Sequence, residues 1–575
     1  MADSYASQTS RMTATNLQRV SAPPLRSGAS RYLFVVALLG LAALRLYWLQ
    51  AYPLNSDEAQ HAHVAWAWTR GLLPYRDVFD NHGPLFGLIH SLVLRLTGER
   101  ADVMTWLRLS VQPWYALALA AIWCIGRRMY GARVAMAAVL ITGLFPRFFL
   151  ISGQFRTDDL WAAAWLAALA LVVGAPWRYW RWLLAGVLAG AALAVSQKTL
   201  LLLVTTLLAA LIVWSVRQSQ RPKGLTGYLL CGLGGLLLVP LGFLAWFQLH
   251  GSLDSAWYGL AGYNMADAGA ADAAQLAKPK GGGIFFKLPW LLLLLGGGIT
   301  ASVVWLRQSR DAVTGWAVLL ALQSGFFLLL IWFVWPLITR QDFLPVIPPL
   351  VLVGCGIVVR QPWLPLGPRR LFALAAVVVV LELGLLVLTA PPWHDELAGR
   401  RAQLADVLRY TDADDTVMDA KGDAIFRMRP YYPVLESLAM RRMRNGLMAD
   451  TITAEMVRHR TMLILPTRLP RTSESFLWHN YVQGEHEVWI AALRVPANGA
   501  TVAVHNEVPG RYVLVDGTKP VSASLDGGPS GSRWDIARGD HQLSTSASGM
   551  LYLVWDQAWD RGWRPSPPAP ATESH

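Results

Sequence analysis

Residues 54–86 read LNSDEAQHAHVAWAWTRGLLPYRDVFDNHGPLF, and they connect the first two long apolar segments of the chain. The stretch opens on Asn55-Ser56-Asp57-Glu58 and closes on the segment 80–85. Because acidic groups at a membrane are costly to desolvate, adjacent carboxylates just past an apolar span point to a functional site. The stretch therefore predicts that Asp57 lies in a cavity at the membrane edge and carries out chemistry there.

The composition predicts an α-helical polytopic membrane protein. Of 575 residues, 54% are hydrophobic and 15% are charged, and the mean hydropathy is +0.36. A soluble chain of this length is normally more polar. About eleven apolar runs approach the ~20 residues that cross a bilayer. The runs are 32–51, 103–125, 133–151, 159–175, 181–197, 199–216, 225–248, 285–305, 313–335, 343–360 and 370–390.

The first run, 32–51, is open to two interpretations. It could be a cleaved signal peptide, but the long polar leader 1–31 and the lack of a small-x-small site before Asp57 favour an uncleaved anchor. With this run counted as a span, the region after Ala390 lies on the opposite side of the membrane from the N-terminus.

The distribution of Lys and Arg predicts the orientation in the membrane, because cytoplasmic loops are enriched in these residues. Basic residues occupy alternate connections, as a chain that crosses back and forth requires. We therefore expect a multi-pass protein of the bacterial inner (plasma) membrane, with a cytoplasmic N-terminus and a periplasmic C-terminal region. No basic module interleaved with aromatic residues suggests nucleic-acid binding. The basic connections carry Arg26 and Arg31, Arg127, Arg128 and Arg133, Arg178 and Arg181, Arg217, Arg221 and Lys223, Arg307 and Arg310, and Arg360, Arg369 and Arg370.

The changes in composition along the chain predict its domains. In the first outer loop, Asp57 to Arg70 is predicted to form a helix along the surface with Ser56 as N-cap, and 84–97 a second interfacial helix. The loop 249–284 is either a plain connector or a lid. After Ala390 the pattern is mixed α/β and then β-rich. The predicted parts are a disordered tail 1–31, a transmembrane domain 32–390 with its outer loop 52–102, an α/β region 391–500, a β-rich region 501–563 and a disordered tail 564–575.

Charged residues beside the apolar runs are the candidates for chemistry. Asp57 and Glu58 either complement a helix dipole or act on a substrate, and their position favours the second reading. Asp158 lies in a turn that is either a second acidic site or only a polar turn. Lys198 and Arg340 either snorkel to the surface or bind a phosphate.

Histidines follow the acidic pair and raise the question of a metal. Asp57 and His61 lie four residues apart on one helical face, which would permit a shared divalent ion. No established ligand spacing supports that ion, so the metal is left open, and no other cofactor is expected. The loop residues Asp80, His82 and Tyr258 are candidates to contact an acceptor.

The order of these features resembles the GT-C glycosyltransferases that depend on polyprenyl phosphate, the group of the protein O-mannosyltransferases and the aminoarabinose transferases of lipid A. The resemblance covers about 32–390. It departs from the family where Thr157 replaces a Pro and where Gly83-Pro84 replaces a Pro-Pro pair. The landmarks are 57–59 (Asp-Glu-Ala), 80–85 (Asp-Asn-His-Gly-Pro-Leu), 126–131 (Gly-Arg-Arg-Met-Tyr-Gly), 156–158 (Arg-Thr-Asp), 194–198 (Ala-Val-Ser-Gln-Lys) and, more weakly, 340–349.

The resemblance implies a GT-C fold, with Asp57 as the catalytic carboxylate and Glu58 and Asp158 beside it. Lys198, Arg340 and Arg156 would bind the donor phosphate. The implied reaction transfers a hexosyl or pentosyl group, with inversion, from a lipid phosphate to a glycan, lipid or protein on the periplasmic face. Two alternatives remain from the sequence: a transporter or flippase of lipid-linked sugars, and a non-catalytic envelope scaffold. The flippase is disfavoured because the charges cluster at the outer edge instead of the midplane.

Overall fold

The structure is a computed structural model that describes residues 27–216, 224–263, 312–335, 338–360 and 368–565. It forms two compact units, Met1–Leu46 and Tyr47–His575. In the first, the described part is helix α2, which runs from Ser27 to Tyr47. The predicted span 285–305, most of the predicted lid and both predicted disordered tails, apart from 27–31 and 564–565, lie outside the described residues.

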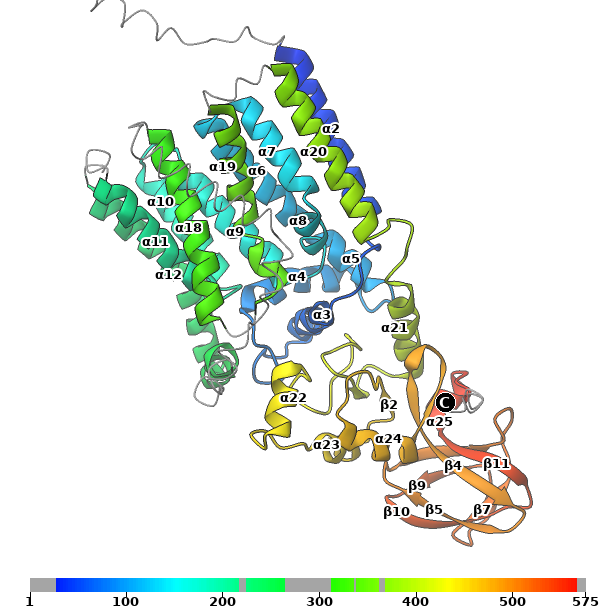
Figure 1. Ribbon diagram of the computed structural model, residues 1–575. Coiled ribbons are helices and arrows are strands. Elements are labelled where there is room, and N and C mark those ends of the chain that lie inside the picture. The colour runs from blue at the N-terminus through cyan, green and yellow to red at the C-terminus, as the bar shows by residue number, and fades with distance from the viewer. Residues whose placement is uncertain (1–26, 217–223, 264–311, 336–337, 361–367, 566–575) are drawn as a thin grey trace, which may run out of the picture. The chain divides into compact units, whose positions relative to one another are not determined.

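The second unit contains the long apolar helices (Figure 1). Among the described residues, four segments are long and apolar enough to cross a membrane: Val103–Met129, Thr199–Val216, Leu225–Leu249 and Val313–Val334. The fold class is thus confirmed, while the count of eleven spans stays a prediction. The bundle helices are α6 (Gln112–Met129), α7 (Ala132–Leu144), α8 (Pro146–Ile151), α9 (Thr157–Val172), α10 (Tyr179–Leu193), α11 (Thr199–Val216), α12 (Leu225–Leu249), α18 (Ala312–Val334), α19 (Ile347–Arg360) and α20 (Pro368–Thr389).

One predicted span, 133–151, is not a single helix. Helix α7 ends at Leu144, and Pro146 begins the short helix α8 in a new direction. Proline lacks an N–H and its ring clashes with the preceding turn, so it starts a helix but does not continue one. The break matters because it places Arg147 at the beginning of α8.

The first outer loop forms two helices, α3 (Ser56–Thr69) and α4 (Pro84–Thr97), as predicted. The N-cap of α3 is Asn55, however, and not Ser56. The Asn55 side chain accepts the Asp57 N–H at 3.0 Å, while the Glu58 carboxylate accepts the Asn55 N–H at 2.9 Å. This capping box orients both acidic side chains at the first turn.

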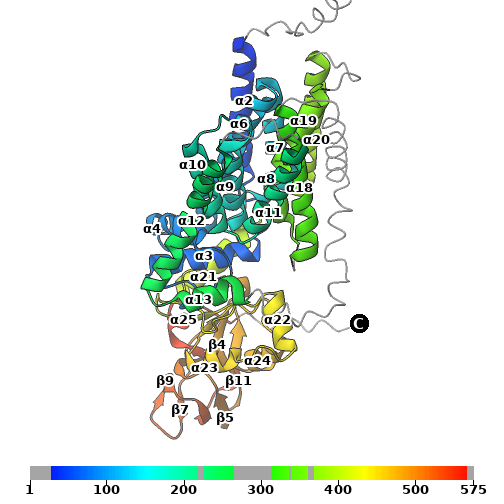
Figure 2. The same cartoon turned by 90° about the vertical axis from the view of Figure 1, so that its left-hand side faces the viewer.

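The sequence predicted that this first helix lies along the surface, and that prediction is wrong. The residues of α3 from Glu58 to Ala67 are buried. Its Trp66 side chain stacks on His63, and His63 Nδ1 hydrogen-bonds the carbonyl of Ile425 in the C-terminal domain at 2.9 Å. Figure 2 shows α3 between the bundle helices and that domain. The helix is therefore an internal element that both parts of the unit cover.

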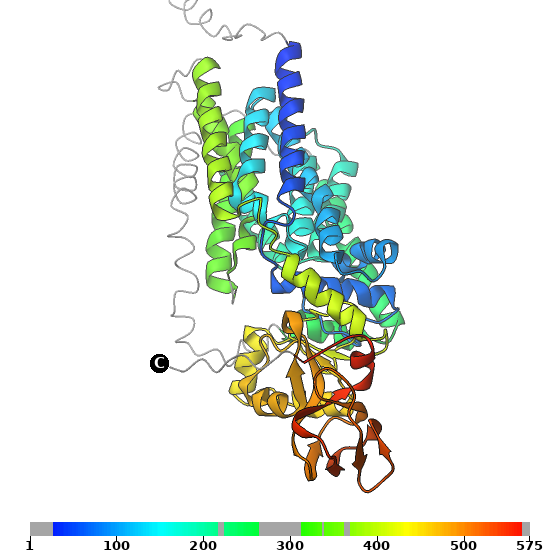
Figure 3. The same cartoon turned by 90° about the vertical axis from the view of Figure 1, so that its right-hand side faces the viewer.

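The C-terminal domain is a mixed sheet with helices, followed by a smaller antiparallel sheet, which confirms the predicted α/β and β-rich pattern. The first sheet has the order β1-β2-β4-β11-β6-β9, with β3 also on β4, and the second has the order β5-β10-β7-β8. Among the strands that the structure describes, β1 and β2 pair in parallel and the other pairs are antiparallel. Figure 3 shows the strands on the side of α3 away from the long helices. The strands are β1 (Val417–Met418), β2 (Leu463–Ile464), β3 (Tyr481–Gln483), β4 (Trp489–Asn498), β5 (Thr501–Asn506), β6 (Gly510–Val515), β7 (Ala523–Leu525), β8 (Ser530–Gly531), β9 (Arg533–Ile536), β10 (Gly539–Ser544) and β11 (Ser548–Trp555).

The remaining helices lie around these elements. Helix α5 packs against α4, and α21 lies at the start of the C-terminal domain. Phe79, Tyr263 and Val434 form a buried cluster that joins the outer loop to that domain. The helices are α5 (Val103–Ser110), α13 (Leu253–Trp257), the π-helix η2 (Tyr258–Gly262), the 3-10 helix η3 (Arg340–Phe343), α21 (Ala398–Tyr410), α22 (Ser437–Arg444), α23 (Ile452–Arg458), η4 (Arg471–Ser473), α24 (Glu474–Asn480), η5 (Glu485–Glu487) and α25 (Asp556–Asp560).

Candidate active site

The carboxylate of Asp57 is partly exposed and forms ion pairs with two buried cations. Arg156 Nη1 donates to Asp57 Oδ2 at 2.6 Å, and Lys421 Nζ donates to Asp57 Oδ1 at 2.5 Å. The Asp57 side chain is 24% exposed, whereas those of Arg156 and Lys421 are 4% exposed. Burial alone would raise the pKa of Asp57, but the charges of Arg156 and Lys421 outweigh it and hold the pKa well below its usual range. The carboxylate is therefore ionised and reachable from one side.

Glu58 has a different environment from its neighbour. Its carboxylate is fully buried and accepts two hydrogen bonds from Arg108, each at 2.8 Å. It also accepts the Phe155 N–H at 2.8 Å. Because no oxygen faces solvent, Glu58 positions the start of α3 against α5 and the 152–156 turn. The catalytic role that the sequence suggested for Glu58 stays a prediction.

Arg156 joins the two candidate carboxylates of the bundle. Its Nη1 also donates to Asn55 Oδ1 at 2.7 Å, and its Nε donates to Asp158 Oδ2 at 3.1 Å. The side chain is thus engaged with Asp57 and Asp158, and the phosphate-binding role expected from the sequence stays a prediction. Thr157 stands at the first position of α9, where a proline is tolerated, so the departure from the family pattern leaves the turn intact.

Lys198 also has a carboxylate partner. Its Nζ forms an ion pair with the buried Asp342 of η3, and it lies 5.9 Å from the ring centre of Trp161 and 5.6 Å from that of Trp335. Asp158 acts on Lys198 electrostatically as well. Its positive charge is therefore balanced inside the protein, and the phosphate-binding role that the sequence suggested stays a prediction.

These contacts build a row of alternating charges across the site. The sum of its formal charges is zero, so the row as a whole does not attract an anion strongly. Its members, in order, are Lys421, Asp57, Arg156, Asp158, Lys198 and Asp342.

Arg340 differs from the cations of the row. It begins η3, which the Thr339 hydroxyl and the Asp342 carboxylate cap. The Arg340 side chain is exposed and has no hydrogen bond or ion pair within the described residues. Of the three cations expected to bind the phosphate, Arg156 and Lys198 have carboxylate partners, and Arg340 has none in the described part of the chain.

The loop 80–85 reaches the inner end of the site through its backbone. Gly83 N–H donates to the carbonyl of Val195 at 3.1 Å, and Leu85 N–H donates to that of Ala194 at 3.2 Å. A Cβ atom on Gly83 would lie 2.1 Å from the Ala194 carbonyl oxygen. Glycine is therefore required here for close approach and proline would lose the hydrogen bond, which accounts for the departure from the Pro-Pro pattern.

The acceptor candidates lie in different environments. Asp80 is buried and accepts the N–H groups of Asn81 and His82 at 2.8 and 3.0 Å, so it shapes the turn and is not open to an acceptor. His82 is partly exposed and its ring lies 4.5 Å from that of His61. Tyr258 is 49% exposed at the start of η2. His82 and Tyr258 therefore remain the accessible candidates.

The metal candidates do not form a site with a complete ligand set. Among the described residues, no group of three or more His, Cys, Asp and Glu could hold a metal ion. Both Asp57 oxygens accept from cations, and His61 Nε2 is buried without a hydrogen-bond partner in that part of the chain. Burial, with His82 and Arg156, holds the pKa of His61 well below its usual range. This donor set does not fit a divalent ion, and the metal requirement stays a prediction.

Lys421 is the member of the site that sequence reasoning missed. It follows β1 in a loop where Asp419 accepts the N–H groups of Gly422 and Ala424 and pairs with Arg429. This lysine is separated from Asp57 by 364 positions. No motif marks it, so only the packing of the C-terminal domain on α3 could find it.

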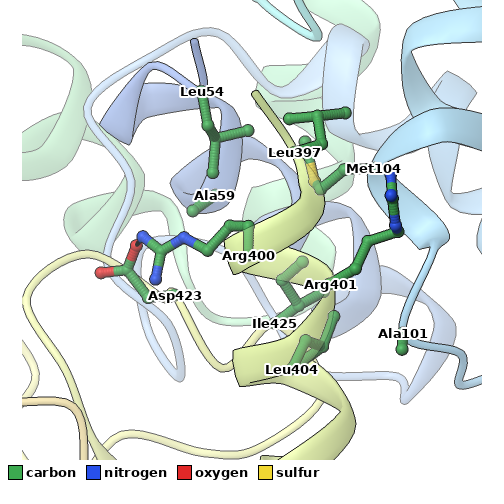
Figure 4. Close-up of a pocket in the computed structure, with 10 residues that line it drawn as sticks. All are labelled: Leu54, Ala59, Ala101, Met104, Leu397, Arg400, Arg401, Leu404, Asp423 and Ile425. Carbon is green, nitrogen blue, oxygen red and sulfur yellow. Dashed lines mark hydrogen bonds and ion pairs between the residues drawn. The ribbon is translucent and has the colours of Figure 1, made fainter. Parts of the chain in front are cut away.

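A pocket next to this loop marks where the domain meets α3 (Figure 4). Arg400 of α21 reaches across it to an ion pair with Asp423. Asp57 is not among the lining residues, so the pocket lies beside the candidate active site and is not part of it. It is lined by Leu54, Ala59, Ala101, Met104, Leu397, Arg400, Arg401, Leu404, Asp423 and Ile425.

Comparisons with known proteins agree on the fold. Residues 81–246 match the model of the dolichyl-phosphate-mannose-protein mannosyltransferase family. The structure is similar to ArnT from Cupriavidus metallidurans bound to undecaprenyl phosphate, at 14% identity and a TM-score of 0.52, covering 79% of this chain and 92% of that one. The structure is also similar to ArnT from Cupriavidus metallidurans in the apo state, at 13% identity and a TM-score of 0.53, covering 90% of this chain and 99% of that one.

A third similar structure is the apo oligosaccharyltransferase of Archaeoglobus fulgidus, at 12% identity and a TM-score of 0.51, covering 79% of this chain and 73% of that one. No curated protein matches in sequence. The resemblance inferred from the motifs is thus confirmed at the level of fold, and the chain has the GT-C fold.

Proposed function

We propose that this GT-C chain is a membrane glycosyltransferase that moves a sugar from a polyprenyl monophosphate to an acceptor on the periplasmic face. The observation that carries the proposal is Asp57, an ionised and partly exposed carboxylate set among buried cations at the end of the helix bundle. The similar ArnT structure binds undecaprenyl phosphate, which supports a lipid phosphate as the donor.

The reaction would be a single displacement. The acceptor hydroxyl oxygen attacks the anomeric carbon, the new carbon–oxygen bond forms, and the bond to the phosphate oxygen breaks. The phosphate leaves with the electron pair as free polyprenyl phosphate, and the hydroxyl proton passes to Asp57. This displacement inverts the anomeric centre.

The low pKa of Asp57 defines its part in that step. A weakly basic carboxylate does not remove the proton of a free hydroxyl efficiently. It can accept the hydroxyl hydrogen bond, orient the oxygen, and receive the proton late, when bond formation has made the hydroxyl acidic. Asp57 thus acts first by orientation, with Arg156 and Lys421 fixing its two oxygens.

The first experiment measures the chemistry directly. Purified protein is supplied with a polyprenyl monophosphate carrying a labelled sugar, and the release of free polyprenyl phosphate is followed. Release that requires an acceptor supports the transferase. Movement of intact donor across a vesicle membrane without cleavage would instead support a flippase, and neither activity would support a scaffold. The carrier lipid that accumulates in a deletion strain identifies the donor.

The second experiment tests the proposed orientation. Reporter fusions at Gly131 and Ala500 are expected on opposite sides of the membrane, with Gly131 cytoplasmic. Both reporters on one side would contradict a periplasmic C-terminal domain and the acceptor side proposed with it.

A further inference from the structure

Arg147 is a second cation near the site, and it has no carboxylate partner among the residues that the structure describes. It lies in α8, directly after Pro146, and α8 contacts η3, which begins at Arg340. The Nη1 atom of Arg147 is buried and has no hydrogen bond within the described residues. A guanidinium nitrogen in that state is costly, because it has lost water without gaining an acceptor.

The charges of Arg147 and Arg340 act on each other. Arg147 is partly buried and Arg340 is exposed. The two like charges repel, and an anion between them would remove the repulsion and supply the missing acceptor. The neighbouring Lys198 cannot play this part without leaving Asp342. The local excess of positive charge therefore belongs to Arg147 and Arg340, next to one end of the neutral row.

We propose that Arg147 and Arg340 together bind the phosphate group of the lipid donor. The proposal rests on the proposed function and assigns the phosphate to a pair that differs from Lys198 and Arg156. A phosphate monoester offers several charged oxygens, which matches two forked guanidinium groups better than a single point charge. The same cations would stabilise the charge that develops on the leaving phosphate.

The location of the pair agrees with this assignment. Arg340 lies two residues before Asp342, which holds Lys198, and Lys198 is electrostatically coupled to Asp158. A phosphate on the pair would therefore lie beside the Asp342 end of the charge row that contains Asp57. The Tyr52 side chain also interacts electrostatically with Arg147, so α8 faces the start of the outer loop.

The test uses the full-length protein in nanodiscs of zwitterionic lipid and measures binding of polyprenyl phosphate directly, by the shift of the thermal unfolding midpoint on titration. The variants are Arg147→Gln, Arg340→Gln, the double variant and Arg147→Lys. The control is Arg76→Gln, because Arg76 is exposed in the outer loop and pairs with its neighbour Asp77. Donor KM and kcat are measured on the same samples.

Each Gln variant is expected to weaken polyprenyl phosphate binding and raise the donor KM by more than about tenfold. The double variant should weaken polyprenyl phosphate binding by less than the product of the two single fold-changes, because both residues bind the same phosphate group. Arg147→Lys should recover part of the binding, which shows that the Gln variant fails through charge and not through misfolding. The control should bind as wild type does.

Two further arms identify the ligand. Inorganic phosphate should compete only at high concentration, and phosphatidylglycerol at the concentration of the donor should not compete. Wild-type binding by Arg147→Gln, or equal Arg147-dependent binding of phosphatidylglycerol, would overturn the proposal. Arg147-dependent binding of polyprenyl phosphate without any sugar transfer by wild type would sink the proposed function and leave the phosphate site standing.

Discussion

Asp57 and Lys421 form an ion pair although 364 positions separate them in the chain. Asp57 lies in the first turn of the first outer helix, and Lys421 follows the first strand of the C-terminal domain. Lys421 is almost fully buried, so its charge is directed at the carboxylate and not at solvent. The C-terminal domain is therefore part of the candidate active site.

Replacing Lys421 with Met should move the acid limb of the pH–activity profile to higher pH. The charged and titratable groups that act on Asp57 are Arg156, Lys421 and His61. Removing Lys421 leaves the effect of burial, which raises the pKa, opposed by fewer cations. The ionised form of Asp57 would then be lost at a higher pH than in wild type.

The measurement is kcat/KM for sugar transfer between about pH 4 and pH 8, which spans the usual carboxyl range. Lys519→Met serves as the control, because Lys519 is exposed in the same domain. A Lys421→Met profile that falls uniformly, with no shift of the acid limb, would show that Lys421 is only structural.

Replacing Asp57 with Asn should abolish most transfer while the protein still inserts and binds donor. The amide keeps the size of the side chain but cannot receive a proton, and loss of one such group typically costs ~10²–10⁴-fold in rate. Single-turnover release of polyprenyl phosphate measures the effect. The exposed Asp254 provides a matched Asp254→Asn control, and wild-type turnover by Asp57→Asn would refute the assignment.

Replacing Glu58 with Gln should act mainly on stability. The change leaves the buried Arg108 without its charge partner, and breaking a buried pair in this way costs about 3–5 kcal/mol. Unfolding in detergent is the measurement, with the exposed Glu485→Gln as control. The double variant with Glu58→Gln and Arg108→Met should lose less free energy of unfolding than the two single variants lose together. Normal stability with lost kcat would instead support a catalytic Glu58.

Replacing Gly83 with Ala should displace the loop 80–85 from residues 194–195. The added Cβ would lie 2.1 Å from a backbone oxygen, which cannot move aside as a side chain can. Such overpacking typically costs about 1–3 kcal/mol, measured as a lower unfolding midpoint. Gly399→Ala, in α21 with open space around its Cβ, should be neutral or stabilising. Equal behaviour of both variants would argue against the close approach.

The sequence by itself determined the helical membrane fold and the helix of the first outer loop, and it singled out the acidic residues 57 and 158, whose role stays a prediction. Each is encoded locally, in apolar runs, in the capping residues and in charges that interrupt apolar segments. The motif order also pointed to the GT-C fold, which the structural comparisons confirm.

The tertiary structure decided which charge faces which. Glu58 and Asp57 are adjacent in sequence, yet Glu58 is fully buried against Arg108 whereas the Asp57 side chain is 24% exposed. Lys198 and Arg340 look alike as lone cations, yet within the described residues Lys198 has a carboxylate partner and Arg340 has none. Arg147 and Lys421 carry no motif at all. A charge is balanced or free according to what packs within a few ångströms of it, and local sequence does not contain those distances between remote segments.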